Sequence, residues 1–178
     1  MKSSRWLPLV WGGLWLLTVG AGLSLRPPLP VDETRYLSVA WEMWLRGDFL
    51  VPHLNGETYS HKPPLLFWLM QAGWAVFGVV EWWPRLIAPL FALASLVLTR
   101  PLARALWPDR PAAAEWAPLI LVGSAFWALF QTLTMFDTLL AAFTLLALLG
   151  LVRFHRDGRW RWVVLIGAAI GLGVLAKG

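Results

Sequence analysis

Residues 31–64 read VDETRYLSVAWEMWLRGDFLVPHLNGETYSHKPP, and this stretch decides how the rest of the chain is interpreted. It holds five of the ten acidic residues and two of the three histidines, and long apolar runs lie on both sides of it. A polar loop between such runs indicates a membrane protein whose chemistry is concentrated in one connection.

The composition supports a membrane protein. Hydrophobic residues make up 58% of the chain and charged residues 14%, and the mean hydropathy is +0.62. A soluble domain carries about 25% charged residues. The net charge of +5 lies in short clusters between apolar runs, which is typical of topology signals rather than of a nucleic-acid surface. Cysteine is absent, so thiolate chemistry and a disulfide framework are excluded.

About 20 apolar residues cross a bilayer as a helix. The first run, Leu7–Leu25, follows Lys2 and Arg5 but is longer than the apolar part of a signal peptide and lacks an A-x-A cleavage site, so we expect an uncleaved anchor. Further apolar runs are Leu65–Val80, Leu86–Trp107, Trp116–Phe136, Thr138–Val152 and Trp162–Ala176. We expect residues 1–178 to be the N-terminal part of one longer membrane domain, divided into a first span (7–25), an external loop (26–83) and further spans (84–178).

The arginines constrain the topology. If all six runs crossed, the arginines of 100–110 and those of 153–161 would face opposite sides, which the positive-inside rule disfavours. The conflict disappears if residues 65–80 do not cross. That run is short, opens with two prolines and contains Gln71 and two tryptophans, which favour the interface. The sequence therefore predicts five crossings, with the N-terminus and both arginine clusters cytoplasmic and the residue 31–64 loop external.

The loop has a predicted structure of its own. Asp32 and Thr34 are good N-cap types, a polar stripe with helical spacing follows, and Gly47 is a typical helix terminator. Residues 48–62 are expected to be irregular, and Pro63-Pro64 to restart a helix. The predicted fold class is thus an all-α integral membrane protein with two juxtamembrane helices in its first external loop.

Four loop residues are candidates for chemistry. Asp32 or Glu33 could act as a general base, although a helix cap or a solvated loop charge explains the same pair. Lys62 could bind an anion, or it could extend toward lipid headgroups. His61 belongs to no metal-binding motif, and a divalent metal ion shared by His61 and a residue outside residues 1–178 remains the alternative.

Two further charges lie in apolar surroundings. Asp137 stands in TLTMFDTLLAAF and Lys177 in GLGVLAKG. A charge within a membrane helix is costly and usually faces a cavity or a partner, whereas the same charge at the end of a span costs much less. The sequence leaves both interpretations open for each residue.

Five segments together carry a family resemblance. They are VDETRY (31–36), GDFLVPHLNGETYSHKPPLLFW (47–68), RLIAP (85–89), MFDTLLAAF (135–143) and GLGVLAKG (171–178). In order and spacing, the set resembles the polyprenyl-phosphate-sugar-dependent glycosyltransferases, which include the protein O-mannosyltransferases and the aminoarabinose transferases that modify lipid A.

This resemblance implies a GT-C-type multi-helix bundle of the bacterial inner membrane with an external active site. It assigns Asp32 as the general base, with Glu33 and Asp137 as further acids of the catalytic cavity. Arg35, Lys62 and Lys177 are the matching cations for the donor phosphate. His61 replaces the glutamate of the EKP motif that is typical of the aminoarabinose transferases.

The implied reaction transfers a sugar from a polyprenyl-phosphate donor to lipid A, another glycan or a protein. It needs no nucleotide, which agrees with the lack of a phosphate-loop glycine pattern. Two alternatives from other classes are a transporter or flippase of lipid-linked sugars and a non-catalytic membrane subunit. A transporter often shows repeated, interrupted spans, and no repeat is evident in this sequence.

Overall fold

The computed structural model describes residues 6–178, and its regular structure is almost entirely helical. Within this described part of the chain, four helices are long and apolar enough to cross a bilayer. These are α1 (Leu7–Leu25), α4 (Trp82–Leu106), α7 (Asp137–Asp157) and α8 (Trp160–Lys177). They match four of the predicted spans, and α1 has the predicted bounds.

The remaining predicted span, Trp116–Phe136, is wrong as a single helix. The chain forms α5 (Pro111–Val122) and then the short α6 (Ala125–Phe130), with extended backbone at Ser124 between them. The break follows a glycine, and the residues after α6 include Gln131, Thr132 and Thr134, whose polar groups are bound by other parts of the chain. Tertiary contacts of this polar segment therefore replace the helix that its apolar neighbours predict.

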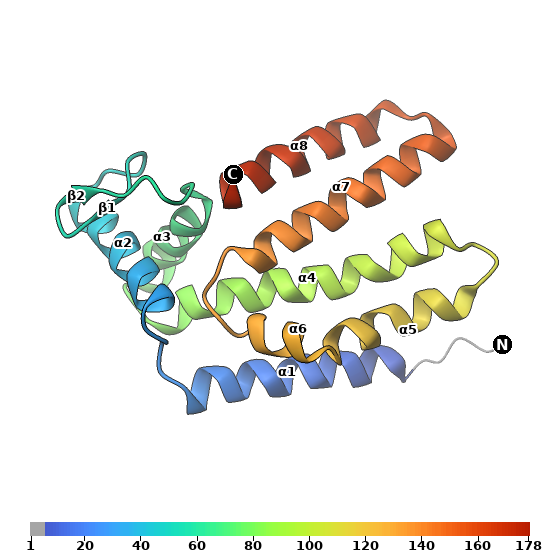
Figure 1. Cartoon of the computed structure of the whole chain (residues 1–178), viewed down its shortest axis with the longest axis horizontal. Helices are drawn as coiled ribbons and strands as arrows, with labels where there is room; N and C mark the ends of the chain where they lie inside the picture. Colours follow the sequence, from blue (N-terminus) through green and yellow to red (C-terminus); the bar gives the residue numbers. More distant parts are fainter. Residues whose placement is uncertain (1–5) are drawn as a thin grey trace.

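The long segments alternate in direction, so the molecule has two distinct ends (Figure 1). At the loop end lie α2 (Asp32–Arg46), α3 (Leu65–Phe77), the start of α7 and the C-terminus of α8. At the arginine end lie the start of α1 and the α4–α5 and α7–α8 connections. Both arginine clusters thus share one end and the candidate residues share the other, as the topology argument requires.

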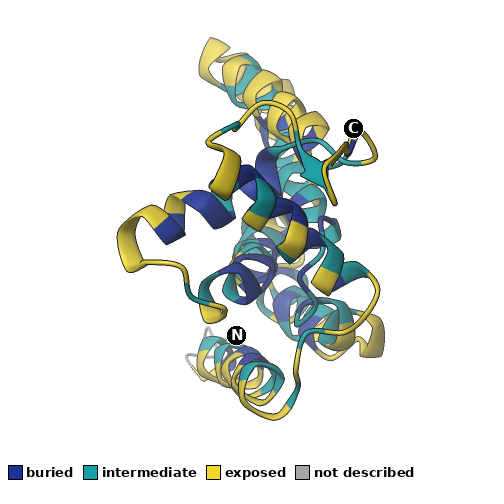
Figure 2. Cartoon of the chain, turned by 90° about the vertical axis from the view of Figure 1, so that its left-hand side faces the viewer, coloured by how far each residue is buried: buried dark blue, intermediate teal, exposed yellow. Residues whose placement is uncertain are grey.

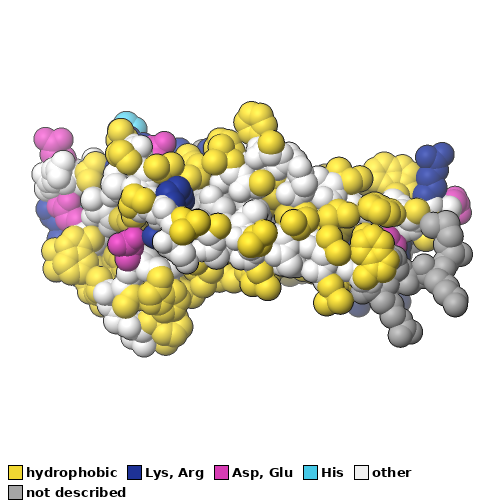
Figure 3. All heavy atoms as spheres, turned by 90° about the horizontal axis from the view of Figure 1, so that it is seen from below, with side chains coloured by type: hydrophobic (Ala, Val, Ile, Leu, Met, Phe, Trp, Pro, Cys, Tyr) yellow, Lys and Arg dark blue, Asp and Glu magenta, His cyan; other side chains and the backbone are white. Residues whose placement is uncertain are grey.

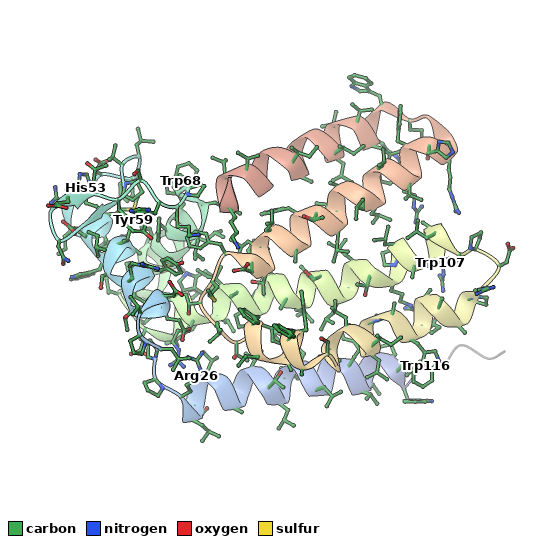
Figure 4. All side chains as sticks on the ribbon, in the orientation of Figure 1. Arg26, His53, Tyr59, Trp68, Trp107 and Trp116 are labelled. Carbon is green, nitrogen blue, oxygen red and sulfur yellow. The ribbon has the colours of Figure 1, made fainter. Side chains whose placement is uncertain are left out.

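The middle of the bundle exposes apolar side chains. Leu16, Leu17 and Ile120 are 64%, 69% and 71% exposed, and in Figure 3 charged groups gather toward the two ends of the molecule. Trp107 and Trp116 lie at the arginine end (Figure 4), whereas Trp41 and Trp74 pack against each other at the loop end. Apolar flanks between two tryptophan-rich ends are the arrangement of a protein that spans a bilayer.

The loop end is built on α2 and α3. Residues 48–62, predicted to be irregular, contain a short hairpin of β1 (His53–Leu54) and β2 (Glu57–Thr58). Its turn is Asn55-Gly56, both with positive φ, which is the commonest hairpin-turn dipeptide. The Gly56 amide donates to Glu42 of α2 at 2.9 Å, so the hairpin is held against that helix.

Helix α3 is too short to span the membrane. Its 13 residues extend about 20 Å, against a hydrocarbon core of about 30 Å. It packs instead on α2, where Val39, Ala40 and Met43 are fully buried. Figure 2 shows that the helices of the loop end have buried and exposed positions on different sides. The pair is the predicted set of juxtamembrane helices.

A close approach joins α3 to α4. A Cβ added at Gly73 would lie 1.8 Å from Nε1 of Trp83, and this Nε1 donates to the Leu69 carbonyl at 2.9 Å. Only glycine leaves room for the indole at this position.

We therefore expect Gly73→Ala to lower the free energy of unfolding by about 1–3 kcal/mol, because the indole must move and lose its hydrogen bond. Denaturant unfolding of the full-length protein in detergent micelles measures the change. Gly12→Ala in α1 is the matched control, since nothing lies within 4 Å of its added Cβ. Equal stability of the two variants would contradict the proposed packing.

Candidate active site

Glu33 is the buried centre of the loop end. Its side chain is 2% exposed, and its carboxylate accepts hydrogen bonds from the Leu29 amide at 2.8 Å and the Thr134 amide at 2.7 Å. The guanidinium of Arg26 contacts both carboxylate oxygens, and Arg26 also donates to the Thr132 carbonyl at 2.7 Å. One carboxylate thus joins the end of α1, the start of α2 and the segment that leads into α7.

These contacts keep Glu33 ionised. Burial acts to raise the pKa of its carboxyl, and the hydrogen bonds from Arg26, Leu29 and Thr134 outweigh burial, so the pKa lies below its ordinary value of 4.5. A carboxylate with all these donors has little capacity left to accept a substrate proton. In the structure Glu33 contacts groups that hold the loop end together, and its role as a further acid of the catalytic cavity stays a prediction.

Arg85 fastens α1 to α4. Its side chain is 7% exposed, and it donates to the carbonyls of Gly22 at 2.8 Å and Arg26, with a further contact to Glu81. The last carbonyls of a helix lack partners within that helix, so Arg85 caps the C-terminus of α1. Further along the same face, the Trp15 indole donates to the Pro89 carbonyl at 3.0 Å. The RLIAP segment (85–89) therefore forms part of the contact between α1 and α4.

Asp32 lies one residue before Glu33 but points toward solvent, with 47% of its side chain exposed. Its carboxylate contacts Arg35, and the Tyr36 hydroxyl lies 3.5 Å from the same oxygen. The N-cap position of α2 is Val31, and no side chain caps it, so the capping explanation for Asp32 is wrong. Burial and the negative charge of Asp32 raise the pKa of Tyr36, which keeps its phenol protonated as a donor.

An aromatic floor connects Asp32 to Lys62. Tyr36 meets Phe136 edge-on with ring centroids 4.9 Å apart, and Phe136 packs on Phe67 at 5.7 Å. The Lys62 ammonium lies 5.7 Å from the centroid of the Phe136 ring and makes no ion pair within residues 6–178. Tyr59 completes the floor beside Phe67 (Figure 4). Lys62 therefore lies at the same end as the acidic residues, and no carboxylate within residues 6–178 neutralises its positive charge.

Asp137 and Lys177 form an ion pair with Nζ and Oδ1 2.6 Å apart. Asp137 is the first residue of α7, so its negative charge complements the dipole of that helix. The side chains of Lys177 and Asp137 are 36% and 44% exposed. The structure therefore selects the span-end interpretation for Asp137, and it places Lys177 against Asp137, next to Phe136.

A groove leads away from Lys177 between α7 and α8. Its volume is about 460 Å³, and apart from Lys177, Gly173, Gly178 and Thr144 its lining is alanine, leucine, isoleucine, valine and phenylalanine. The groove follows the apolar length of the helices, so its chemistry suits a hydrocarbon chain whose polar end lies at Lys177.

No metal-binding group is evident among residues 6–178, since no three His, Cys, Asp or Glu side chains converge there. His61 is exposed and packs against Tyr59 with ring centroids 5.3 Å apart. Within the described residues His61 therefore belongs to no metal-binding cluster, and a divalent metal ion that it shares with a residue outside residues 1–178 stays a prediction.

The structure thus brings Asp32, Arg35, Lys62, Asp137 and Lys177 to one end of the bundle and places Glu33 beneath them. Sequence reasoning did not find the residues that hold this end together, which are Arg26, Arg85 and Thr134. Arg26 directly follows the first span, and Arg85 directly precedes the apolar run Leu86–Trp107; these positions were the available signals.

The fold has close counterparts among solved structures. ArnT from Cupriavidus metallidurans bound to undecaprenyl phosphate superposes with a TM-score of 0.84 and 26% identity, covering 96% of this chain and 32% of that one. Its apo state gives a TM-score of 0.80. The match defines the class of the fold, that of the membrane-embedded GT-C proteins.

The sequence comparisons define the family. The profile of dolichyl-phosphate-mannose-protein mannosyltransferase matches residues 61–178, and the chain belongs to this family. The undecaprenyl phosphate-alpha-4-amino-4-deoxy-L-arabinose arabinosyl transferase of Pseudomonas savastanoi pv. phaseolicola is 32% identical over 97% of this chain. Such an enzyme of Pseudomonas fluorescens is 33% identical, also over 97%. The chain spans 30% and 28% of the lengths of these two relatives. The family resemblance read from the sequence is confirmed.

Glu33→Gln should lower the free energy of unfolding by about 2–3 kcal/mol, because it leaves Arg26 beside a neutral group and weakens the bonds from two amides. Denaturant unfolding of the full-length protein at neutral pH measures this loss. Asp32→Asn is the control, and its change should stay within about 0.5 kcal/mol because that carboxylate is half-exposed.

We also expect the effect of Glu33→Gln on the free energy of unfolding to depend on pH. Because the pKa of Glu33 is lowered in the folded state, its contribution to stability is fully present above pH 4.5 and is lost as the pH falls through the folded-state pKa. The stability difference between wild type and Glu33→Gln should therefore narrow below pH 4.5. A difference that is constant down to pH 3 would contradict an ionised Glu33.

Proposed function

We propose that the protein containing this chain is an inverting glycosyltransferase that moves a sugar from a polyprenyl phosphate to an acceptor hydroxyl or phosphate on lipid A, a glycan or a protein. The proposal is supported by one cluster at the loop end: Lys177 lines an apolar groove and pairs with Asp137, Lys62 lies over the neighbouring Phe136 ring, and Tyr36, which packs on that ring, follows the Arg35–Asp32 pair. Acids to accept a proton, cations to hold a phosphate and a channel for a hydrocarbon chain are the parts that such a reaction needs.

With a hydroxyl acceptor, the reaction is one displacement. The acceptor oxygen attacks the anomeric carbon as its proton passes to the Asp32 carboxylate. The bond between that carbon and the phosphate oxygen breaks, and the polyprenyl phosphate leaves with the electron pair. Attack from the face opposite the leaving group inverts the anomeric centre.

The cations would stabilise the charge that develops on the leaving phosphate. Lys62 is suited to this because it has no carboxylate partner within residues 6–178 and is held over an aromatic ring. Arg35 contacts Asp32, which places a guanidinium fork beside the base. Lys177 adds a third positive charge, and Asp137 orients it.

The donor lipid would lie along the groove between α7 and α8. The groove begins at Lys177 and its apolar walls match a polyprenyl chain, so a bound donor would have its phosphate among the cations. The relatives named above bear names that include an undecaprenyl phosphate sugar, and the crystallised ArnT was bound to undecaprenyl phosphate. Both names agree with this donor class.

The orientation follows from the charges. The arginine end would face the cytoplasm and the loop end the periplasmic side of the bacterial inner membrane. Catalysis would then occur where lipid-linked sugars meet acceptors outside the cytoplasm.

We expect Asp32→Asn to lower sugar transfer by about 10²-fold or more, because the amide cannot accept the proton. Lys62→Ala should lower it by about 10²–10³-fold through the lost charge. The assay uses membranes with equal amounts of the full-length protein, radiolabelled undecaprenyl phosphate-4-amino-4-deoxy-L-arabinose and other polyprenyl phosphate sugars, and a crude envelope acceptor.

Glu57→Gln is the matched control, because Glu57 is an exposed carboxylate of the same loop and should leave transfer unchanged. Normal transfer by Asp32→Asn would exclude Asp32 as the base. If wild type transferred no sugar from any donor but moved labelled lipid between leaflets, the protein would be a transporter.

A further inference from the structure

A basic pocket lies at the arginine end, away from the proposed active site. Its volume is about 340 Å³, and it is lined by Val97, Arg100, Pro101 and Arg104 of α4 and by Arg153 of α7. The four α4 residues are spaced i, i+3, i+4 and i+7, so they form one face of that helix. The neighbouring helix supplies the opposite wall.

The pocket keeps an excess of positive charge. Glu115 of α5 is the carboxylate next to it, and it pairs with Arg100 at 2.6 Å and with Arg104 at 3.3 Å. Arg153 makes no ion pair within the part of the chain that the structure describes. Three guanidinium groups thus face one carboxylate, which leaves a net charge of +2. Arg156 also reaches across from α7 to the Ala105 carbonyl of α4.

The arginines are held in place. Glu115 fixes Arg100 and Arg104 from one side, and the Arg153 guanidinium lies 5.9 Å from the centroid of the Trp162 ring. Guanidinium groups restrained in this way lose less freedom when they bind an anion, and their planar forks match phosphate oxygens.

The pocket also has an apolar floor. Val97 lies one turn closer to the middle of α4 than Arg100, and it is 53% exposed. A ligand that places a phosphate among the arginines would therefore lay any attached hydrocarbon chain over Val97, toward the apolar middle of the bundle. Free phosphate would make no use of this floor.

We infer that this pocket binds the phosphodiester headgroup of an anionic phospholipid, with an acyl chain along α4. Basic pockets between membrane helices are suited to such headgroups. The inference does not depend on the proposed transferase activity, because its residues lie at the opposite end of α4 and α7 from Arg85 and Asp137.

The test measures binding of phosphatidylglycerol to the full-length protein by native mass spectrometry in detergent. Arg104→Gln combined with Arg153→Gln should weaken binding by about tenfold or more. Arg100 is left intact so that Glu115 keeps a partner between α4 and α5. A melting temperature close to that of wild type would show that the double variant is folded.

Arg159→Gln combined with Arg161→Gln is the control. It removes the same charge at the same end but outside the pocket, from residues that face Asp157, and it should keep wild-type binding. Equal losses in the two double variants would overturn the site in favour of general attraction. Equal binding of phosphatidylcholine, or displacement by millimolar inorganic phosphate, would also overturn an anionic-lipid site.

Discussion

The buried carboxylate of Glu33 is the contact on which the loop end depends. It is bound by Arg26 and by the amides of Leu29 and Thr134, from segments about a hundred residues apart in sequence. An ionised group in such a place is stable only when these donors are all present, because burial alone would make its charge costly. Where Glu33 is satisfied, the end of α1, the start of α2 and the approach to α7 have one relative arrangement.

That arrangement determines where the candidate catalytic residues lie. Successive residues of a helix point about 100° apart, so when Glu33 faces inward Asp32 faces outward. The hydrogen bond from the Thr134 amide to Glu33 fixes the segment that leads to Phe136 and Asp137. A single buried group therefore aligns the proposed base on α2 with the Asp137–Lys177 pair on α7 and α8, although it touches no substrate in the proposed reaction.

Much of this architecture could be predicted from the sequence. Apolar length gave the bounds of α1, and the arginines showed that residues 65–80 do not cross, because both features follow from the bilayer and need no knowledge of packing. The break between α5 and α6 could not be found in this way. Nor could the polar segment after α6, where Gln131 and the Thr134 amide donate hydrogen bonds to distant residues and the Thr132 carbonyl accepts one from Arg26, since those partners are known only once the fold is known.

The sequence predicted which residues belong to the candidate site better than it predicted where each of them points. The sequence named both acids of the Asp32-Glu33 pair, but only burial distinguishes the outward residue from the inward one. It left Asp137 and Lys177 as two separate charges, since nothing local indicates that the start of α7 meets the end of α8. The short hairpin was missed because two-residue strands have no periodicity to detect.

The two charged ends of the molecule are joined by the same two helices. Asp137 and Arg153 lie 16 residues apart on α7, which is about 24 Å along a helix. The proposed lipid pocket can therefore act on the active-site cluster mechanically, because α4 carries Arg85 near one end and Arg104 near the other, and α7 likewise joins Asp137 to Arg153. A headgroup that draws these two helices together at one end would shift the packing of α7 against α4, and the hydrogen bonds that join Arg85 of α4 to the end of α1 would limit the movement of α4 at the other end.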